Sequence, residues 1–276
     1  KGISSFQAFT ISAAQRIGTA NIAGVATAIV VGGPGAVFWM WIVALLGAGT
    51  AFFEATLAQV YKVRDKESGF RGGPAYYMTK GLNQKGIGYV FAVLMTITFG
   101  IVFVMLQSNT IANAYDEAFG INTAVSGIVV AIVVALVIFG GAKSIANVAT
   151  AIVPVMAGLY IILVTVILVM NYDMIIPMLQ TIVVNAFGIE EVFGGALGAA
   201  IINGFQRGLL SNEAGMGSAP NAAASAAVRH PIQQGLIQSL GVYFDTIIVC
   251  TATAIVILLY TDLSFGADAP QGIAVT

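Results

Sequence analysis

The sequence predicts an all-α integral membrane protein, built as a bundle of several membrane-spanning helices. Of its 276 residues, 58% are hydrophobic and only 8% are charged, whereas soluble domains carry about 25% charged residues. The mean hydropathy is +0.94. The apolar runs are continuous rather than alternating, which favours helices over strands, and a helix satisfies its own backbone in lipid. The net charge of −1 gives no indication of a nucleic-acid partner.

Seven segments are long and apolar enough to cross a hydrocarbon core about 30 Å thick. The sixth is too long for one straight crossing, which fits either two half-helices or one crossing with a cytoplasmic extension. A Gly-Gly-Pro-Gly turn separates the first two, because proline cannot continue a helix. The predicted spans are residues 6–31, 36–61, 87–114, 122–140, 144–170, 192–227 and 232–260.

Basic residues are concentrated between the second and third spans, in residues 62–86, which hold six of the 11 lysines and arginines. The positive-inside bias predicts that this loop is cytoplasmic. Alternation from there places the N-terminus of the chain in the cytoplasm and makes the protein a multi-pass protein of the cell membrane. Within the loop, residues 68–78 are predicted to include a short helix on the inner membrane surface.

Polar side chains in the third span gather toward its outer half. They are commonly hydrogen-bond partners between helices, and Gln107 is the best candidate for a binding role, since its amide both donates and accepts. The fourth and fifth spans are nearly featureless and are predicted to be scaffold. The chain begins without Met and ends in a polar stretch, so we expect it to be a piece of a longer protein.

Five charged side chains fall inside the predicted spans. An ionisable group at the centre of a bilayer costs about 2.5–3.5 kcal/mol on insertion scales, so each is expected to face the protein interior and to have a partner. Two bases and three acids favour ion pairs, which either serve function or only hold helices together. The predicted charge network consists of Arg16, Glu54, Arg207, Glu213 and Asp245.

One stretch occurs twice, as residues 15–28 and again 191 positions later as residues 206–219. Gln, Arg, Asn, Ala, Gly and the final Ala coincide without a gap. Both copies interrupt an apolar run with small and polar residues, and the predicted topology gives them opposite orientations. Close helix packing explains the small residues equally well, but paired asparagines at Asn21 and Asn212 favour a binding site of the kind found in secondary transporters.

Helix breaks are expected inside both copies. In the first, Gly18 to Asn21 should unwind, because an asparagine amide competes for nearby backbone groups. In the second, the break is expected to run from Gly208 through residues 211–217. Unwound carbonyls can coordinate Na⁺, and the following N–H groups can hold a substrate carboxylate.

Two other classes of function are less well supported. A channel predicts a pore-lining ring of repeated polar residues, which the spans do not show. An enzyme is not predicted either, because the sequence contains no H-E-x-x-H, no G-x-S-x-G and no paired-aspartate motif.

Four motifs resemble those of the alanine or glycine:cation symporters. Residues 18–26 (GTANIAGVA) are similar to the family's G-T-G-N-I-x-G-V-A, and residues 207–220 (RGLLSNEAGMGSAP) match R-G-x-x-S-N-E-A-G-x-G-S-A-P. Residues 72–76 (GGPAY) and 230–235 (HPIQQG) resemble G-G-P-x-Y and H-P-x-x-Q-G. Ala20 departs from the family's usual second glycine; its added methyl would either narrow the pocket, which changes the size limit on the substrate, or stiffen the unwound turn.

The resemblance implies a five-plus-five inverted-repeat fold of the leucine-transporter type, with helices one and six interrupted. Residues 1–170 would form the first repeat and residues 171–276 the start of the second. It further implies symport of Na⁺ (sometimes H⁺) with L- or D-alanine or glycine by alternating access, with no cofactor besides the coupling ion. Another small-solute transporter of the same fold is the alternative. The implied substrate residues are Gly18, Thr19, Ala20, Asn21, Gln107, Phe205, Ser211 and Asn212, and the Na⁺ candidates are Ile17, Asn21 and Ser211.

Overall fold

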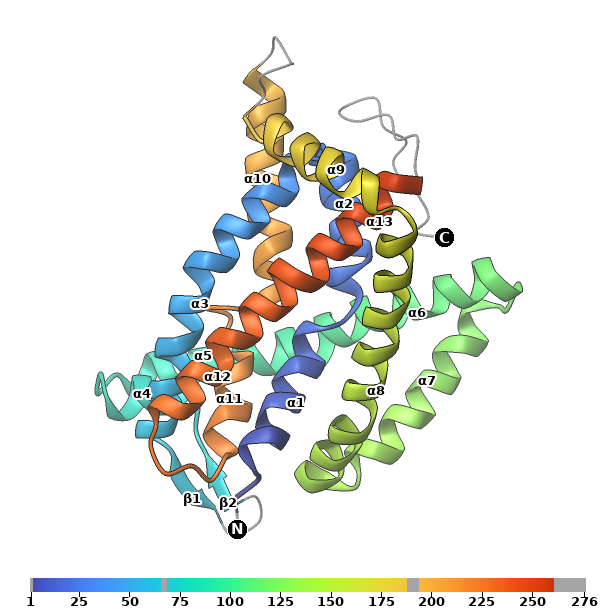
Figure 1. Cartoon of the computed structure of the whole chain (residues 1–276). Coiled ribbons are helices and arrows are strands. Elements are labelled where there is room, and N and C mark those ends of the chain that lie inside the picture. Colours follow the sequence, from blue (N-terminus) through green and yellow to red (C-terminus); the bar gives the residue numbers. More distant parts are fainter. Residues whose placement is uncertain (1, 66–68, 188–193, 261–276) are drawn as a thin grey trace.

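The computed structural model describes residues 2–65, 69–187 and 194–260, and these residues are almost entirely helical (Figure 1). The predicted all-α class is confirmed. The helices are α1 (Ser5–Arg16), α2 (Ala23–Gly32), α3 (Ala36–Val60), α4 (Pro74–Lys80), α5 (Lys85–Ile97), α6 (Phe103–Phe119), α7 (Thr123–Ile138), α8 (Gly141–Met170), α9 (Tyr172–Asn185), α10 (Gly194–Asn212), α11 (Ser218–Ser225), α12 (Ile232–Val242) and α13 (Thr251–Tyr260).

Two π-helical segments and one short 3₁₀ turn complete the helical elements. The π segment η2 (Thr98–Val102) joins α5 to α6, and η3 (Tyr243–Cys250) joins α12 to α13. The 3₁₀ turn η1 (Thr19–Asn21) lies between α1 and α2. Since π-helical turns widen a helix locally and often lie at functional sites, the position of Asp245 within η3 directs attention to that segment.

Four continuous helices among the described residues are long and apolar enough to cross a membrane: Ala36–Val60, Lys85–Phe119, Lys143–Met170 and Ile232–Tyr260. They correspond to the second, third, fifth and seventh predicted spans. The fourth predicted span is the shorter helix α7. The first and sixth are each interrupted, and the first residues of the sixth predicted span, 192 and 193, lie outside the described part of the chain.

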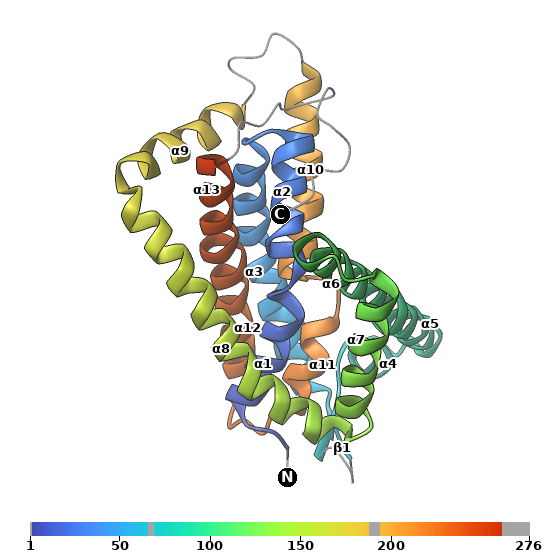
Figure 2. The same cartoon turned by 90° about the vertical axis from the view of Figure 1, so that its right-hand side faces the viewer.

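Three elements, two short strands and one helix, were not predicted. Strands β1 (Val63–Asp65) and β2 (Gly69–Arg71) form an antiparallel hairpin in the basic loop, with an Arg71 Nε to Asp65 Oδ2 distance of 3.3 Å. Helix α9 crosses the end of the bundle at a steep angle to α8 (Figures 1 and 2). The short helix expected in residues 68–78 is present only from Pro74, as α4, because residues 69–71 form strand β2; its position on the inner membrane surface stays a prediction.

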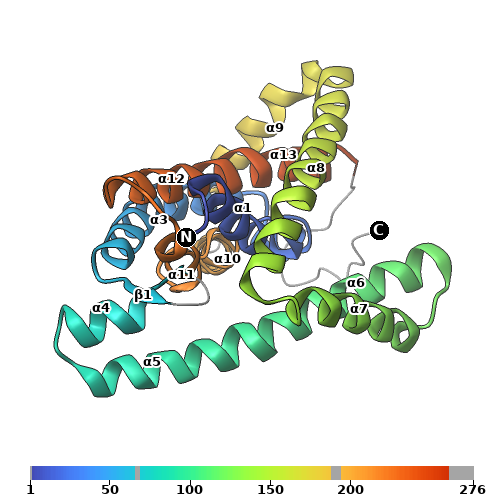
Figure 3. The same ribbon diagram turned by 90° about the horizontal axis from the view of Figure 1, so that it is seen from below.

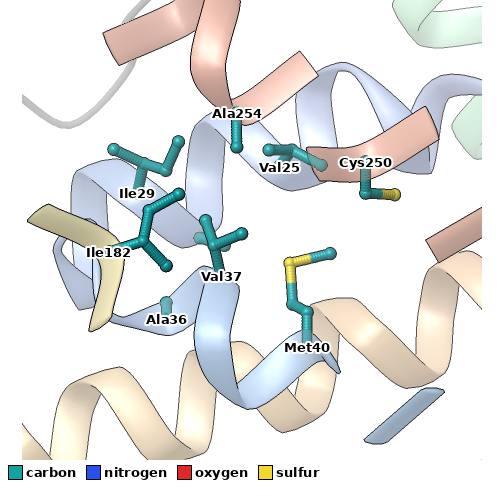
Figure 4. Close-up of a cluster of buried hydrophobic side chains, with 9 residues drawn as sticks. Val25, Ile29, Ala36, Val37, Met40, Ile182, Cys250 and Ala254 are labelled. Atoms are coloured by element: carbon teal, nitrogen blue, oxygen red, sulfur yellow. The ribbon is translucent and has the colours of Figure 1, made fainter. Parts of the chain in front are cut away.

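The main apolar core joins α2, α3, α9, η3 and α13 (Figure 4). Because lipid tails are as apolar as these side chains, the cluster stabilises the bundle through close packing rather than transfer from water. Cys250, a buried free cysteine, is part of it. Its buried members are Val25, Ala28, Ile29, Ala36, Val37, Met40, Ile182, Cys250 and Ala254.

Helices α5, α6 and α7 lie along one side of the molecule, away from this core (Figure 3). The most apolar stretch of Lys85–Phe119 has no buried residue within the structure. Gln107 of α6 is an exception to this separation, since the Thr19 backbone N–H donates to its Oε1 at 3.4 Å. This contact brings α6 to the first interrupted helix.

A clasp, formed by Ile3, Lys62 and the segment Ser225–Ala227, closes the end of the molecule where the chain begins. The Ile3 N–H donates to the Ser225 carbonyl at 3.2 Å, and the Ala227 N–H donates to the Ile3 carbonyl at 2.9 Å. Lys62 Nζ donates to the Ala226 carbonyl at 2.7 Å. Partial burial lowers the pKa of the Lys62 ammonium. The start of α1 and the end of α11 are thereby held together.

Candidate functional site

The first interrupted helix breaks between Arg16, where α1 ends, and Ala23, where α2 begins. Gly18 adopts an extended conformation, and its N–H donates to Asn21 Oδ1 at 3.4 Å. The side-chain amide of Asn21 therefore competes for a backbone group that a continuous helix would use. The break lies where the sequence predicts it, at Gly18 to Asn21.

The second interrupted helix breaks between Asn212 and Ser218. The turn contains three residues with positive φ, namely Glu213 (52°), Gly215 (85°) and Gly217 (84°). Asn212 Oδ1 accepts a hydrogen bond from the Ala214 N–H at 3.0 Å, and the Glu213 carboxylate accepts one from the Ser218 hydroxyl. The turn is thus held by its own side chains.

The extent of this second break differs from the prediction. Helix α10 remains regular through Gly208 and Ser211 and ends only at Asn212. Gly208 allows close helix packing instead: a Cβ there would lie 3.2 Å from both Met40 and Val43 of α3. Small residues before the break serve packing, and only residues 213–217 form the turn.

The two interrupted helices lie antiparallel and side by side (Figures 1 and 2). Helix α2 packs against α10, and α1 packs against α11. The chain runs from the N-terminal end toward α2 in the first helix, and in the opposite direction from α10 to α11 in the second. Both breaks consequently lie at the same level of the bundle.

Asp245 of η3 joins the two breaks through its carboxylate. Asn21 Nδ2 donates to Oδ1 at 2.5 Å, and Ser211 Oγ donates to Oδ2 at 2.6 Å. Thr246 Oγ1 also donates to Oδ2, at 3.2 Å. All four side chains are at most 2% exposed. We call Asn21, Ser211, Asp245 and Thr246 the polar centre.

Arg16 lies next to the polar centre at the end of α1, and its side chain is 2% exposed. Its Nε donates to the Asn212 carbonyl at 2.9 Å, and its Nη1 donates to the Gln238 carbonyl at 3.2 Å. The predicted ion pairs are wrong here: the guanidinium binds two backbone carbonyls rather than a carboxylate.

Within the described residues, the other members of the predicted charge network do not form ion pairs either. Glu54 Oε2 accepts from the Gly215 N–H at 2.9 Å, and Glu213 bonds to Ser218. The Nε of Arg207 is buried without a hydrogen-bond partner in the described part of the chain. The physical reason is that the second helix break leaves backbone groups without partners: the Gly215 N–H donates to Glu54, and the Asn212 carbonyl accepts from Arg16.

The predicted substrate residues separate into groups. Gly18 and Thr19 lie against Gln107, since a Cβ on Gly18 would be 3.0 Å from its Nε2. Asn21 and Ser211 belong to the polar centre. Ala20 is buried beside Gly24 in the first break.

Two predicted substrate residues are not drawn into these groups. Asn212 is bonded within its own turn, and its Nδ2 has no partner among the described residues. The Phe205 ring lies 6.2 Å from that of Trp39 on α3. Neither side chain forms a hydrogen bond to the polar centre within the described residues.

The oxygens available for a monovalent cation come from backbone, amide, hydroxyl and one carboxylate group. Ile17 ends α1 in an extended conformation, which leaves its carbonyl beyond the last turn of the helix. No group of three or more His, Cys, Asp or Glu side chains forms a metal site in the described residues. This donor set suits a weakly held alkali cation better than a transition metal.

The sequence analysis did not select three residues of the site: Thr246, Gln238 and Gly241. Gln238, Gly241 and Asp245 are spaced by three and four residues, which places them on one face of a helix. This face of the helix contacts both breaks: the Gln238 carbonyl accepts from Arg16, and Asp245 accepts from Asn21 in the polar centre. This spacing is visible in the sequence and is enough to predict that the three residues share one helix face.

Comparison with known proteins identifies the family. Residues 1–276 match the sodium:alanine symporter family over their whole length. The chain belongs to this family. Its members are transporters, not enzymes, and the apolar helices agree with a membrane protein.

Several curated members of the sodium:alanine symporter family are similar to the chain. The amino-acid carrier protein AlsT of Bacillus subtilis is 58% identical over 261 residues, covering 95% of this chain and 56% of AlsT. The probable sodium/glutamine symporter GlnT of the same organism is 53% identical, covering 99% and 57%. The sodium/alanine symporter AgcS of Methanococcus maripaludis is 46% identical, covering 93% and 58%. The chain therefore spans a little more than half the length of these relatives.

Proposed function

We propose that the protein containing this chain is a secondary active transporter that couples Na⁺ entry to uptake of a small neutral amino acid, alanine or glycine, by alternating access. The observation that carries the proposal is the meeting of two antiparallel interrupted helices at one buried carboxylate, Asp245. Family membership supports the same reading.

The substrate site would lie at the first break and extend toward the second. Helix α2 begins at Ala23 without a side-chain cap, so its first N–H groups are free to bind the carboxylate of an amino acid. On the side of this break that faces α6, the Thr19 N–H contacts Gln107 of α6. The methyl group of Ala20, where the family usually has glycine, would favour a small substrate.

Na⁺ would bind where oxygens of both breaks approach Asp245. Asn21 and Ser211 can each present an oxygen after a side-chain rotation, and the Ile17 carbonyl ends the neighbouring half-helix. A cation bound there would contact oxygens from both interrupted helices and the single negative charge of Asp245. Movement of one Na⁺ across 100 mV supplies about 2.3 kcal/mol, enough for roughly fifty-fold accumulation of the amino acid.

The protein is expected to have an inverted five-plus-five repeat, in which residues 1–170 form the first repeat. The opposite directions of α1–α2 and α10–α11 support this (Figure 1). A proton-coupled or other small-solute transporter of the same fold is the alternative. The relative named as a glutamine symporter makes glutamine the first other substrate to test.

The test is uptake of labelled alanine, glycine and glutamine by the full-length protein in proteoliposomes. We expect concentrative uptake of alanine or glycine with an inward Na⁺ gradient and none with an equal choline gradient. Uptake driven by a pH gradient alone would favour the proton-coupled alternative, and preference for glutamine would correct the substrate. Uptake indifferent to both gradients would overturn the proposal.

A further inference from the structure

Arg16 connects three elements at the level of the two breaks. It is the last residue of α1, it donates from Nε to the last carbonyl of α10 at 2.9 Å, and it donates from Nη1 to the Gln238 carbonyl of α12 at 3.2 Å. An arginine fork can hold two acceptors in a fixed geometry. One buried side chain thus sets the relative positions of α1, α10 and α12.

The position of this guanidinium has an electrostatic reason. Helices α1 and α10 both end here, and each C-terminal end carries a partial negative charge of about half an elementary charge. Two such ends repel one another when they meet inside a protein. The positive charge of Arg16 lies between them and offsets this repulsion.

The neighbouring helix is shaped to admit the guanidinium. A Cβ on Gly241 would lie 2.5 Å from Arg16 Nη1 and 3.6 Å from the Phe9 ring. Any other residue at position 241 would push the guanidinium from its place. Gly241 lies one turn before Asp245, so Arg16 and the polar centre use the same face of this helix.

We propose that Arg16 is the positioning residue of the ion site: by fixing the ends of α1 and α10 on α12, it brings Asn21 and Ser211 to Asp245. The inference rests on the proposed Na⁺-coupled transport and adds to it a residue that touches neither the ion nor the amino acid. A residue needed only for folding would change the amount of protein. A positioning residue changes the apparent affinity for Na⁺.

Two variants of the full-length protein test the proposal by different routes. Arg16→Lys keeps the charge but cannot reach both carbonyls with a planar fork. Gly241→Ala keeps the arginine and displaces it through the new methyl group. We expect each to raise the Na⁺ concentration for half-maximal alanine uptake by about tenfold, the loss of roughly one charge-assisted hydrogen bond, with a much smaller change in maximal rate.

Matched controls separate this effect from general damage. Arg207→Lys changes the other intramembrane arginine, whose Nε has no partner in the described chain. Gly158→Ala adds a methyl to α8 where, beyond the local helix backbone, no described residue has an atom within 4 Å. Both should keep the half-saturation concentration of the unchanged protein.

The outcomes are distinct. Na⁺ half-saturation within twofold of the unchanged protein in both test variants would overturn the inference, and so would their loss from the membrane, which would show a role in folding alone. If the unchanged protein shows no Na⁺-dependent uptake of any amino acid, the proposed function fails instead.

Discussion

Asp245 is the residue on which the two halves of the candidate site depend. Each of its carboxylate oxygens accepts a hydrogen bond from a different interrupted helix, at 2.5 and 2.6 Å. A carboxylate offers acceptors on both oxygens, whereas an amide replaces one of them with a donor. An amide in this position would therefore leave Asn21 or Ser211 facing another donor.

We predict that Asp245→Asn lowers Na⁺-driven alanine uptake at least about tenfold, because one buried donor loses its acceptor at a cost of about 1–3 kcal/mol. Uptake in proteoliposomes, normalised to the amount of protein, measures the effect. Asp173→Asn, an exposed position on α9, is the matched control and should transport normally. Uptake by Asp245→Asn within twofold of the control would contradict the role given to this carboxylate.

Individual residues of the site were more predictable than their contacts. Asn21 was selected because it interrupts an apolar run and recurs as Asn212 in the second copy, and Ser211 was selected because the family resemblance implies it; both grounds are local in the sequence. Their common partner Asp245 lies 224 and 34 residues away from them, and only the packed bundle reveals the contact. The predicted ion pairs were wrong because sequence gives charge but not the unpaired backbone groups that compete for it.

At the scale of elements, the two breaks are built differently. The first uses an extended glycine and a 3₁₀ turn and has no residue with positive φ. The second is a compact turn with three such residues, braced from α3 by the Glu54 carboxylate on the Gly215 N–H. The second break should therefore tolerate substitution less well than the first.

We predict that Gly217→Ala destabilises the protein by at least about 1–2 kcal/mol, since alanine is strained at a φ of 84°. Its Cβ would also lie 2.6 Å from the Phe91 ring and 2.9 Å from Pro74. Thermal unfolding in detergent should show a lower midpoint than for Gly198→Ala, where the new methyl meets no atom of the described residues within 4 Å beyond the local helix backbone. Equal midpoints would show that this turn relaxes without cost.

The elements that the sequence did not predict share one property. Helix α9 has 14 residues, too few to register as a span, and it packs through Ile182 and through the Ala186 carbonyl that accepts from Trp39 Nε1. The hairpin of β1 and β2 has three residues in each strand. Such short elements depend on tertiary contacts more than on their own periodicity.

At the scale of the whole molecule, the orientation in the membrane remains a prediction from charge. The basic loop of residues 62–86 and the turn between α6 and α7 are separated by the long helix Lys85–Phe119. If that helix spans the membrane, the two must lie on opposite sides. The positive-inside bias assigns the basic loop to the cytoplasm.

We predict that a cysteine at Lys80 is protected from an impermeant thiol reagent in intact cells, and that a cysteine at Glu117 is labelled. Both side chains are exposed in the structure, so accessibility reports the side of the membrane. Cys250 is replaced by alanine in both variants to remove the buried thiol of this chain. The reverse pattern of labelling would invert the assigned orientation.

The clasp at the end of the molecule limits how these helices can move. Ile3, just before α1, forms backbone hydrogen bonds with Ser225 and Ala227 at the end of α11. Lys62, just after α3, donates a further hydrogen bond to the Ala226 carbonyl. A transport cycle that opened this end between α1 and α11 would have to break these bonds. A cycle that kept these hydrogen bonds would move α1 and α11 together as one rigid unit. The passage would then open between this unit and the other helices that pack against it.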